Sequence, residues 1–460
     1  MPTPSGGGAA RPRAAEEPRV ELELPLGAAA PFDLAAAVCS HGLFMMAPNR
    51  WDPAGRALVR PLRLASDSSV SLLARVSAHP ARSDSALLVA VHGAAALSPL
   101  DQNHILEQVR RMLRLSEDDG KMVAEFQAMH PAAREAGFGR VFRSPTLFED
   151  MVKCILLCNC QWTRTLSMAT ALCKLQLELK CSSSIEDFQS RNPPIREHNK
   201  RKRSKRQSVR VKLEARFSED KLEGPRLASG GNGLTNLETY EILSCLPSVA
   251  SEAIGPDDSL EPSELSLSSD PHLEGRISDF PTPEELANLD EEFLAKSCNL
   301  GYRAKRIVML ARSLVEGKVC LQKLGEMRKM FVPAAEEASS IGSTYERLDK
   351  ELSMISGFGP FTRANVLMCM GFFHTIPADT ETIRHLKQIH KRATTISSIH
   401  QELDKIYGKY APFQFLAFWF ELWGFYDKQF GKISDMEPSN YGLFTASHLK
   451  KSKKLEEKQL

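Results

Sequence analysis

The sequence predicts an α+β fold that is mainly helical, with an antiparallel sheet at its N-terminal end and a long disordered insert. Three observations lead to this prediction. Short alternating runs separated by turn residues fill residues 19–96. Apolar residues at helical spacing dominate from residue 97 onward. A stretch rich in Ser, Glu, Gly and Pro then interrupts the helical pattern over residues 183–275, and such a composition cannot bury a core.

The elements follow in order along the chain. The runs VELELPL, ALVRPLRLA, SVSLLARVSA and ALLVAVHG are expected to be the strands of the sheet. Helices are expected from Leu97 and again from Thr282, where Thr282 and Glu285 form a capping-box pattern. The expected segments are a disordered N-terminal tail 1–18, the sheet domain 19–96, the first part of the helical core 97–182, the disordered insert 183–275, the second part of the helical core 276–432 and a C-terminal tail 433–460.

The composition limits the partners of the chain. The net charge is only +2, so any surface that binds nucleic acid must be local. We expect no contact with a membrane, because no apolar run is long enough to span one. The ten cysteines make no paired framework and have no matching Cys/His pair, so no metal site is expected. We expect the chain to be a monomer.

A basic run inside the insert, KRKRSKR, has two interpretations. It can serve as a nuclear localisation signal on an exposed segment, or it can bind DNA phosphates without sequence preference. We favour nuclear targeting, and the two roles are compatible. The basic residues of the run are Lys200, Arg201, Lys202, Arg203, Lys205 and Arg206.

The stretch LSMISGFGPFTRANVLMCMGFFHTIPADTETIRH predicts a helix, a glycine turn, a second helix, a short extended link and a third helix. Gly357 and Gly359 bracket Phe358, so the turn can adopt backbone angles that are closed to other residues. Amides at the start of the following helix make an anion site that suits a DNA phosphate. Taken alone, Asp379 fits an ordinary N-cap of the third helix.

This pattern resembles the helix-hairpin-helix DNA glycosylases, the superfamily of endonuclease III, 3-methyladenine glycosylase and 8-oxoguanine glycosylase. The resemblance implies the helix-hairpin-helix glycosylase fold and, as partner, double-stranded DNA that contains a damaged base. It makes Asp379 the catalytic carboxylate, which stabilises positive charge on the sugar or orients the attacking water. The residues that would hold the DNA backbone through their main-chain groups, in relatives around a monovalent cation, are Gly357, Phe358, Gly359 and Thr362.

Two further segments, ILLCNCQWTRTLSM and LGYRAKR, resemble the 8-oxoguanine glycosylase branch. There an asparagine and a tyrosine fill the gap left by the flipped base, and two arginines read the orphaned cytosine. The resemblance assigns the first role to Asn159 and Tyr302. It assigns the second role to Arg164 and Arg303, whose donors suit the acceptors of cytosine. Without the resemblance, the tyrosine would be a core or capping aromatic, and the arginines would be solvated charges on helix faces.

The sequence departs from this family in ways that change the expected chemistry. Phe361 stands where bifunctional members carry the lysine that attacks the sugar, so strand cutting through a Schiff base is excluded. Glu381 stands where relatives often carry a histidine that contacts phosphate. The cysteines of an iron–sulfur cluster are missing after Asp379, so no cofactor is expected apart from a cation at the hairpin. The segment CSHGLFMMAPNRW lacks the pattern that recognises 8-oxoguanine, which leaves the damaged base open.

Aromatic residues offer a pocket for the base. Phe361, Phe415 and Trp419 are the candidates, although an aromatic stripe at helical spacing is more often plain core. The leading hypothesis is a nuclear DNA glycosylase of base excision repair that flips a damaged purine and hydrolyses its N-glycosidic bond, without lyase activity. One alternative is a catalytically silent protein that binds damaged DNA. Another is an interaction hub built on the insert.

Overall fold

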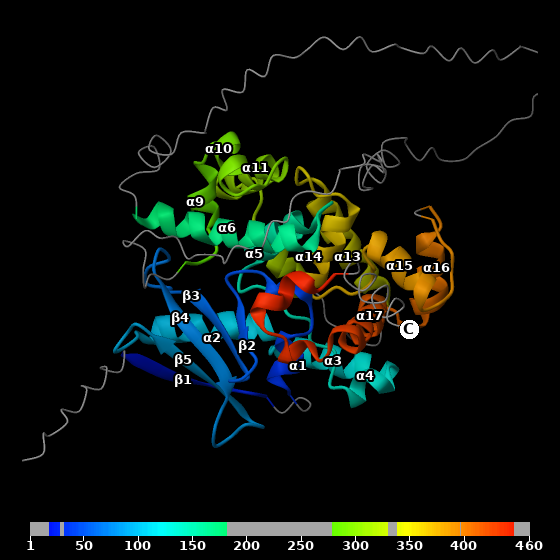
Figure 1. Cartoon of the computed structure of the whole chain (residues 1–460), viewed down its shortest axis with the longest axis horizontal. Helices are drawn as coiled ribbons and strands as arrows, with labels where there is room; N and C mark the ends of the chain where they lie inside the picture. Colours follow the sequence, from blue (N-terminus) through cyan, green and yellow to red (C-terminus); the bar gives the residue numbers. More distant parts are fainter. Residues whose placement is uncertain (1–17, 28–31, 182–277, 330–337, 396, 446–460) are drawn as a thin grey trace, which may run out of the picture.

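The computed structural model describes residues 18–27, 32–181, 278–329, 338–395 and 397–445. It confirms the predicted class, because a five-stranded antiparallel sheet forms the N-terminal end and helices make up most of the rest (Figure 1). The insert, its basic run and nearly all of the predicted N-terminal tail lie outside the described residues. None of the described helices has the length and apolarity that a membrane span requires.

The strands of the sheet are β1 (Arg19–Pro25), β2 (Arg50–Asp52), β3 (Ala57–Arg63), β4 (Ser71–Ala78) and β5 (Ala86–His92). Their order is β1-β5-β4-β3-β2, and all neighbours are antiparallel. Alternation explains β1, in which Leu22 and Leu24 are buried while Glu21 and Glu23 are exposed. The four predicted runs form β1, β3, β4 and β5. The short β2 gives no alternating pattern and is missing from the prediction.

The connection between β1 and β2 is helical rather than extended. The carboxylate of Asp33 caps α1 (Leu34–Val38), and Nδ1 of His41 caps the 3-10 helix η1 (Gly42–Met45). Most residues of this connection are buried. The region predicted as a sheet therefore also supplies a helical segment, which lines the cavity described below.

Before the insert, the helices form at the predicted segments, and each of the first two begins at a serine N-cap. The helices are α2 (Pro99–Leu113), α3 (Glu117–Met129), α4 (Pro131–Glu135), α5 (Leu147–Leu157) and α6 (Trp162–Cys181). Helix α2 packs against the sheet through β1 and β3 (Figure 1). Helix α5 is buried along nearly its whole length, which explains its apolar sequence.

After the insert, Thr282 and Glu285 form the predicted capping box, with hydrogen bonds in both directions. The helices that follow are α9 (Pro283–Ala287), α10 (Glu291–Ser297), α11 (Arg303–Val315), α12 (Leu321–Lys329), α13 (Ala338–Ser353), α14 (Pro360–Met370), α15 (Thr380–Gln388), α16 (Ile399–Tyr407) and α17 (Gln414–Phe430), with the 3-10 helices η2 (Gly408–Tyr410), η3 (Ile433–Asp435) and η4 (Pro438–Leu443). In Figure 1, α14 lies in the middle of the molecule beside α5, and α15 and α16 lie at the end away from α9 and α10.

The predicted C-terminal tail begins too early. Residues 433–445 form η3 and η4 and bury the side chains of Ile433, Tyr441 and Phe444. The indole of Trp51 in β2 also donates to the carbonyl of Ser434 at 2.7 Å. Aromatic side chains in this segment gain enough buried area to hold it against the sheet and α17.

Two buried arginines from the first helical part hold the last turn of α14. Arg114 donates to the carbonyls of Met368 at 2.7 Å and Cys369 at 3.1 Å, and Arg143 donates to that of Cys369 at 2.9 Å. The last carbonyls of a helix lack intrahelical donors, so such partners stabilise its end. Asp119 lies 3.8 Å from Arg114 and 3.7 Å from Arg143. Burial raises the pKa of Asp119, but the neighbouring arginines outweigh it and lower this pKa to about 2.

Asp119→Asn is expected to reduce the free energy of unfolding by roughly 2–4 kcal/mol at neutral pH, because buried arginines lose their counter-ion. The folded pKa of about 2 lies below the value of about 3.9 for an unfolded aspartate. The stabilisation is therefore complete above about pH 4 and is lost as the pH falls towards 2. Urea unfolding of both proteins across this range should show the difference shrinking at low pH.

The control is Asp118→Asn, which makes the same change at an exposed position in the same first turn of α3. It should change the free energy of unfolding by less than about 0.5 kcal/mol. An equal loss in the two variants would contradict the role given to Asp119.

Candidate active site

A cavity of about 520 Å³ lies between the start of α15, the first turns of α14 and one face of α17. Its volume is in the range of ligand pockets in proteins, about 300–1,000 Å³. The connection that follows α1 closes another side through His41, Gly42 and Leu43. Four residues singled out in the sequence line this cavity together: Asp379, Phe361, Phe415 and Trp419.

Asp379 is the N-cap of α15 and also borders the cavity. Its Oδ1 accepts hydrogen bonds from the amide of Thr382 at 2.8 Å and from the hydroxyl of Thr382 at 2.9 Å. The side chain is open to the cavity, but protein surrounds it closely, and this desolvation raises the pKa of Asp379 above its ordinary value. The hydrogen bonds from Thr382 act in the opposite direction, and the charge of Glu381 adds to the rise. The geometry thus combines the capping role with a carboxylate at the cavity.

Glu381 also lines the cavity, and its carboxylate is held by neighbouring donors. Its carboxylate accepts from Nε of Arg384 at 2.8 Å, from a second nitrogen of that guanidinium and from the hydroxyl of Tyr426. The guanidinium in turn lies 4.7 Å from the ring centroid of Phe425. The carboxylate of Glu381, a position where relatives often carry a histidine that contacts phosphate, is therefore already paired with the guanidinium of Arg384.

One wall of the cavity is a stack of rings on α17. Phe415, Trp419 and Trp423 follow one another at four-residue spacing, with centroids 5.5 Å apart in both pairs and interplanar angles of 10° and 27°. The indole of Trp419 donates to the carbonyl of Ser40 at 2.8 Å, and that of Trp423 to the carbonyl of Cys39 at 2.8 Å. The aromatic stripe is thus both part of the core and a wall of the cavity.

His41 contacts this wall from the other end of the chain. Its ring lies 4.4 Å from that of Trp419, and its Nδ1 accepts the amide of Leu43 at 3.3 Å. Burial, helped by the charge of Arg114, lowers the pKa of His41 to about 3, so the ring is neutral at physiological pH. A neutral imidazole that accepts at Nδ1 carries its proton on Nε2. His41 therefore adds a hydrogen-bond donor beside the aromatic wall.

Phe361 lines the cavity on the first turn of α14. Among the described residues that surround the cavity, none is a lysine. The nearby Arg363 donates from Nε to Asp349 at 2.8 Å and from a terminal nitrogen to the carbonyl of Phe358 at 3.1 Å, so it links α14 to α13. The described walls of the cavity therefore offer no amine that could attack a sugar.

The predicted hairpin joins α13 to α14. Gly357 has a φ of +87°, and a Cβ at this position would lie 2.6 Å from Cδ of Arg306. Gly359 has an ordinary φ of −70°, has open space around it and is the N-cap of α14. Phe358 is buried, and its amide donates to the carbonyl of Ile355 at 3.1 Å. The amides available to a phosphate are therefore those at the start of α14 rather than that of Phe358.

Two residues assigned to the DNA surface have buried side chains. Thr362 is 2% exposed, and its hydroxyl lies 3.0 Å from Sγ of Cys158. Arg303 is also 2% exposed, and its guanidinium donates to the carbonyls of Cys158 and Asn159. Both side chains hold the turn that follows α5. Because it is buried there, the guanidinium of Arg303 does not reach an orphaned base. The role predicted for Thr362 uses its main-chain groups, which burial of its side chain does not exclude.

The other three residues assigned by resemblance to the 8-oxoguanine glycosylase branch are exposed around this turn: Asn159, Arg164 and Tyr302. Asn159 adopts a left-handed φ of 46°, and the hydroxyl of Tyr302 donates to the carbonyl of Cys158 at 3.3 Å. The ring of Tyr302 lies 4.8 Å from the guanidinium of Arg306, the same side chain that packs on the glycine of the hairpin. The turn, the exposed tyrosine and the hairpin are therefore neighbours on one surface.

Several residues of the cavity were not predicted from the sequence. Asn365 lies one turn after Phe361 on α14 and donates to its carbonyl at 2.8 Å, so helical spacing could have indicated it. No such signal exists for His41, because its segment meets α17 only through contacts such as the Trp419–Ser40 bond, 379 residues apart. The other such residues include Gln161, Trp162 and Tyr426.

No family model and no curated protein matches the chain. Its structure is similar to that of a 3-methyladenine DNA-glycosylase from Archaeoglobus fulgidus, with 13% identity and a TM-score of 0.47, over 88% of this chain and 98% of that one. It is also similar to two structures of the Clostridium acetobutylicum 8-oxoguanine glycosylase/lyase, one in its apo-form and one in complex with dsDNA containing cytosine opposite to 8-oxoG. Both are 12% identical, with TM-scores of 0.43 and 0.44, and cover 84% and 86% of this chain and 93% of their own. Identities this low bear on the fold alone, so any activity has to be argued from the residues of the site.

Gly357→Ser is expected to reduce the free energy of unfolding by roughly 1–3 kcal/mol, because a side chain is strained at a φ of +87° and its Cβ would displace Arg306. The control is Gly359→Ser, which adds the same side chain where φ is ordinary and nothing lies within 4 Å of a Cβ. Serine is a good N-cap, so this variant should stay within about 0.5 kcal/mol of the parent. Urea unfolding measures both variants, and equal losses would contradict the strain assigned to Gly357.

Proposed function

We propose that the chain is a DNA glycosylase of base excision repair that removes a damaged purine from double-stranded DNA. The observation that carries the proposal is the placement of Asp379, whose carboxylate borders the same cavity as a stack of three aromatic rings. A base flipped out of a duplex needs a flat apolar surface on which to stack. The sugar that it leaves needs a negative charge beside it. The cavity offers both.

The chemistry assigned to each group follows from its position. As the N-glycosidic bond breaks, the sugar gains oxocarbenium character, and the ionised carboxylate of Asp379 stabilises this charge or accepts a proton from the attacking water. Phe415 and Trp419 stack on the flipped base. His41 would donate from Nε2 to an acceptor on the base edge, which purines present.

Water, rather than an amine of the protein, is the proposed nucleophile. Phe361 occupies the position of the family lysine, and no lysine is present among the described residues that line the cavity. Without an amine there is no Schiff base and no coupled strand cutting. The expected product is therefore an intact strand with an abasic site.

The DNA surface is proposed to run from the hairpin to the turn after α5. Amides at the start of α14, beyond Gly359, would bind a phosphate, and the proposal includes a monovalent cation at the hairpin. Asn159 and Tyr302 would fill the gap left by the flipped base, and Arg164 would meet the opposite strand. The proposal includes action as a monomer in the nucleus, directed there by the basic run at 200–206.

A second function is a catalytically silent protein that binds damaged DNA. The observation that favours it is the hydrogen bonding of Asp379, whose Oδ1 is used by Thr382 as any helix cap would be. This protein would use the same surface and the same aromatic cavity. It would bind abasic or lesion DNA tightly and would release no base.

Duplexes that carry a single 8-oxoguanine, alkylated purine or uracil, each opposite cytosine and other bases, separate these functions. Half of each reaction is treated with hot alkali, which cuts abasic strands. Cutting that requires alkali is the expected result and identifies the base. Lesion-dependent binding without any cutting would support the silent protein, and cutting without alkali would contradict the water mechanism.

Asp379→Asn is expected to slow base release by roughly 10²–10⁴-fold while lesion binding stays unchanged. Asparagine caps a helix about as well as aspartate, so α15 keeps its start and only the charge is lost. The rate is measured in single-turnover reactions on the best substrate. The control is Asp290→Asn, the same change at the N-cap of α10, where Oδ1 accepts the amide of Phe293 at 2.8 Å. Full activity in Asp379→Asn would sink the catalytic assignment.

Base release is also expected to decline at acid pH, because only the ionised form of Asp379 stabilises the sugar cation. Desolvation raises the pKa of Asp379, so the midpoint of the decline should lie above the value of about 3.9 for a free aspartate. The side-chain hydrogen bond from Thr382 lowers this pKa, so Thr382→Val should move the midpoint to higher pH. The rate of base release is measured against pH for the parent and for Thr382→Val. A midpoint at lower pH in the variant would contradict the effect assigned to the Thr382 hydrogen bond.

A further inference from the structure

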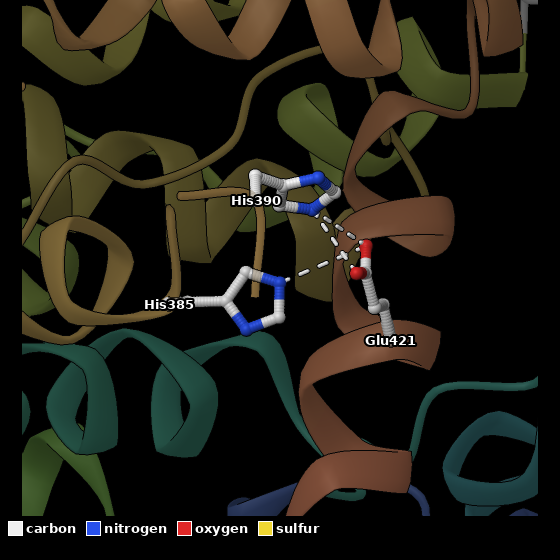
Figure 2. Close-up of side chains that lie close together, drawn as sticks. All are labelled: His385, His390 and Glu421. Carbon is white, nitrogen blue, oxygen red and sulfur yellow. Dashed lines mark hydrogen bonds and ion pairs between the residues drawn. The ribbon is translucent and has the colours of Figure 1, made fainter. Parts of the chain in front are cut away.

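A second cluster of chemically active side chains lies away from the candidate active site, between α15 and α17. His385, His390 and Glu421 each offer one ligand atom, and these three atoms lie within 4.8 Å of one another. Figure 2 shows the two imidazoles directed at the carboxylate of Glu421, which is on α17, while His385 is on α15 and His390 lies just beyond its end. Nε2 of His390 lies 3.0 Å from Glu421, and Nε2 of His385 lies 3.7 Å from it.

The hydroxyl of Tyr407 completes a four-cornered arrangement. It lies 3.2 Å from Nε2 of His385, 3.0 Å from Nε2 of His390 and 2.7 Å from Oε2 of Glu421. Bonds of about 2.0–2.1 Å to a tetrahedral zinc ion imply ligand atoms about 3.3 Å apart. The five separations, from 2.7 to 3.7 Å, bracket this value. Five of the six separations among the four atoms are therefore close to those of a tetrahedral zinc site, and the sixth, between the two imidazoles, is within 4.8 Å.

The ligand atoms of the two histidines and the glutamate favour one kind of ion. Two imidazoles and one carboxylate are the ligands of zinc sites that hold three protein groups and leave a fourth position. Magnesium and calcium prefer shells made of oxygen, and only one carboxylate is offered here.

The cluster has a buried side and an open side. His385 is fully buried, and its Nδ1 has no hydrogen-bond partner among the described residues, so its polar contacts are made through Nε2. The side chains of His390 and Glu421 are 23% and 32% exposed. Both line a separate cavity of about 600 Å³, which provides a route of entry for an ion.

We propose that His385, His390 and Glu421 bind one zinc ion, with the Tyr407 hydroxyl or a water molecule at the fourth corner. The ion clamps the end of α15 to the middle of α17. Asp379 is the N-cap of α15, and α17 carries Trp419 two residues before Glu421. The ion would therefore fix the carboxylate of one cavity wall relative to the rings of the other. The site stands independently of any glycosylase activity.

The test uses the full chain, purified without a histidine tag, stripped with a chelator and titrated with zinc chloride. One zinc ion per chain by elemental analysis, with a higher Tm, is the expected result. His390→Gln should weaken zinc binding by more than about 100-fold and remove the rise in Tm. The control is His400→Gln, an exposed histidine on α16, which should bind zinc as the parent does. No stoichiometric zinc in the parent, or equal affinity in the two variants, would overturn the proposal.

Two further measurements separate the proposed site from its rivals. Cobalt(II) held by imidazole and carboxylate gives weak visible bands, whereas an intense near-ultraviolet sulfur-to-metal band would place the ion on cysteines and overturn the proposal. Tyr407→Phe removes the hydroxyl that links the four side chains by hydrogen bonds. This variant should still bind one zinc ion, at most about tenfold more weakly than the parent. Loss of zinc equal to that in His390→Gln would overturn the three-ligand assignment.

Discussion

The anchoring of α14 in the middle of the protein is the constraint on which the rest depends. Arg114 and Arg143, buried with Asp119 as counter-ion, bind the carbonyls at its C-terminal end. Its N-terminal end carries the glycine turn and presents Phe361 to the cavity. Buried charged groups form strong hydrogen bonds only when the geometry is fixed. The two arginines therefore hold the C-terminal end of α14 in one position. The position of α14 in turn fixes the positions of the hairpin and of Phe361 in the cavity wall.

The cavity is assembled from parts that lie far apart in the chain. The indoles of Trp419 and Trp423 bind the carbonyls of Ser40 and Cys39, which brings the connection after β1 against α17. That connection then places His41 beside the ring stack. The N-terminal region therefore does more than cover a core, because it supplies one side of the candidate site.

Helices α15 and α17 link the two clusters of active side chains. Asp379 stands at the start of α15, and the two histidines of the proposed zinc site stand near its end. Helix α17 likewise carries both the ring stack of the cavity and Glu421 of the proposed zinc site. An ion bound near the end of α15 and the middle of α17 would restrict the motion of the parts of these helices that line the cavity. Such a restriction would serve the proposed role of Asp379, because catalysis requires exact placement of the reacting groups.

Local signals in the sequence determined the α+β class, four of the five strands, the capping box at Thr282, the glycine turn and the N-cap position of Asp379. Each depends on residues close in sequence, where spacing and backbone preference act directly. Only the tertiary structure decided that Arg303 and Thr362 are buried, that the segment after 433 is packed, and that His41 joins the cavity. The reason is that burial of a polar side chain depends on partners hundreds of residues away, which no local pattern records.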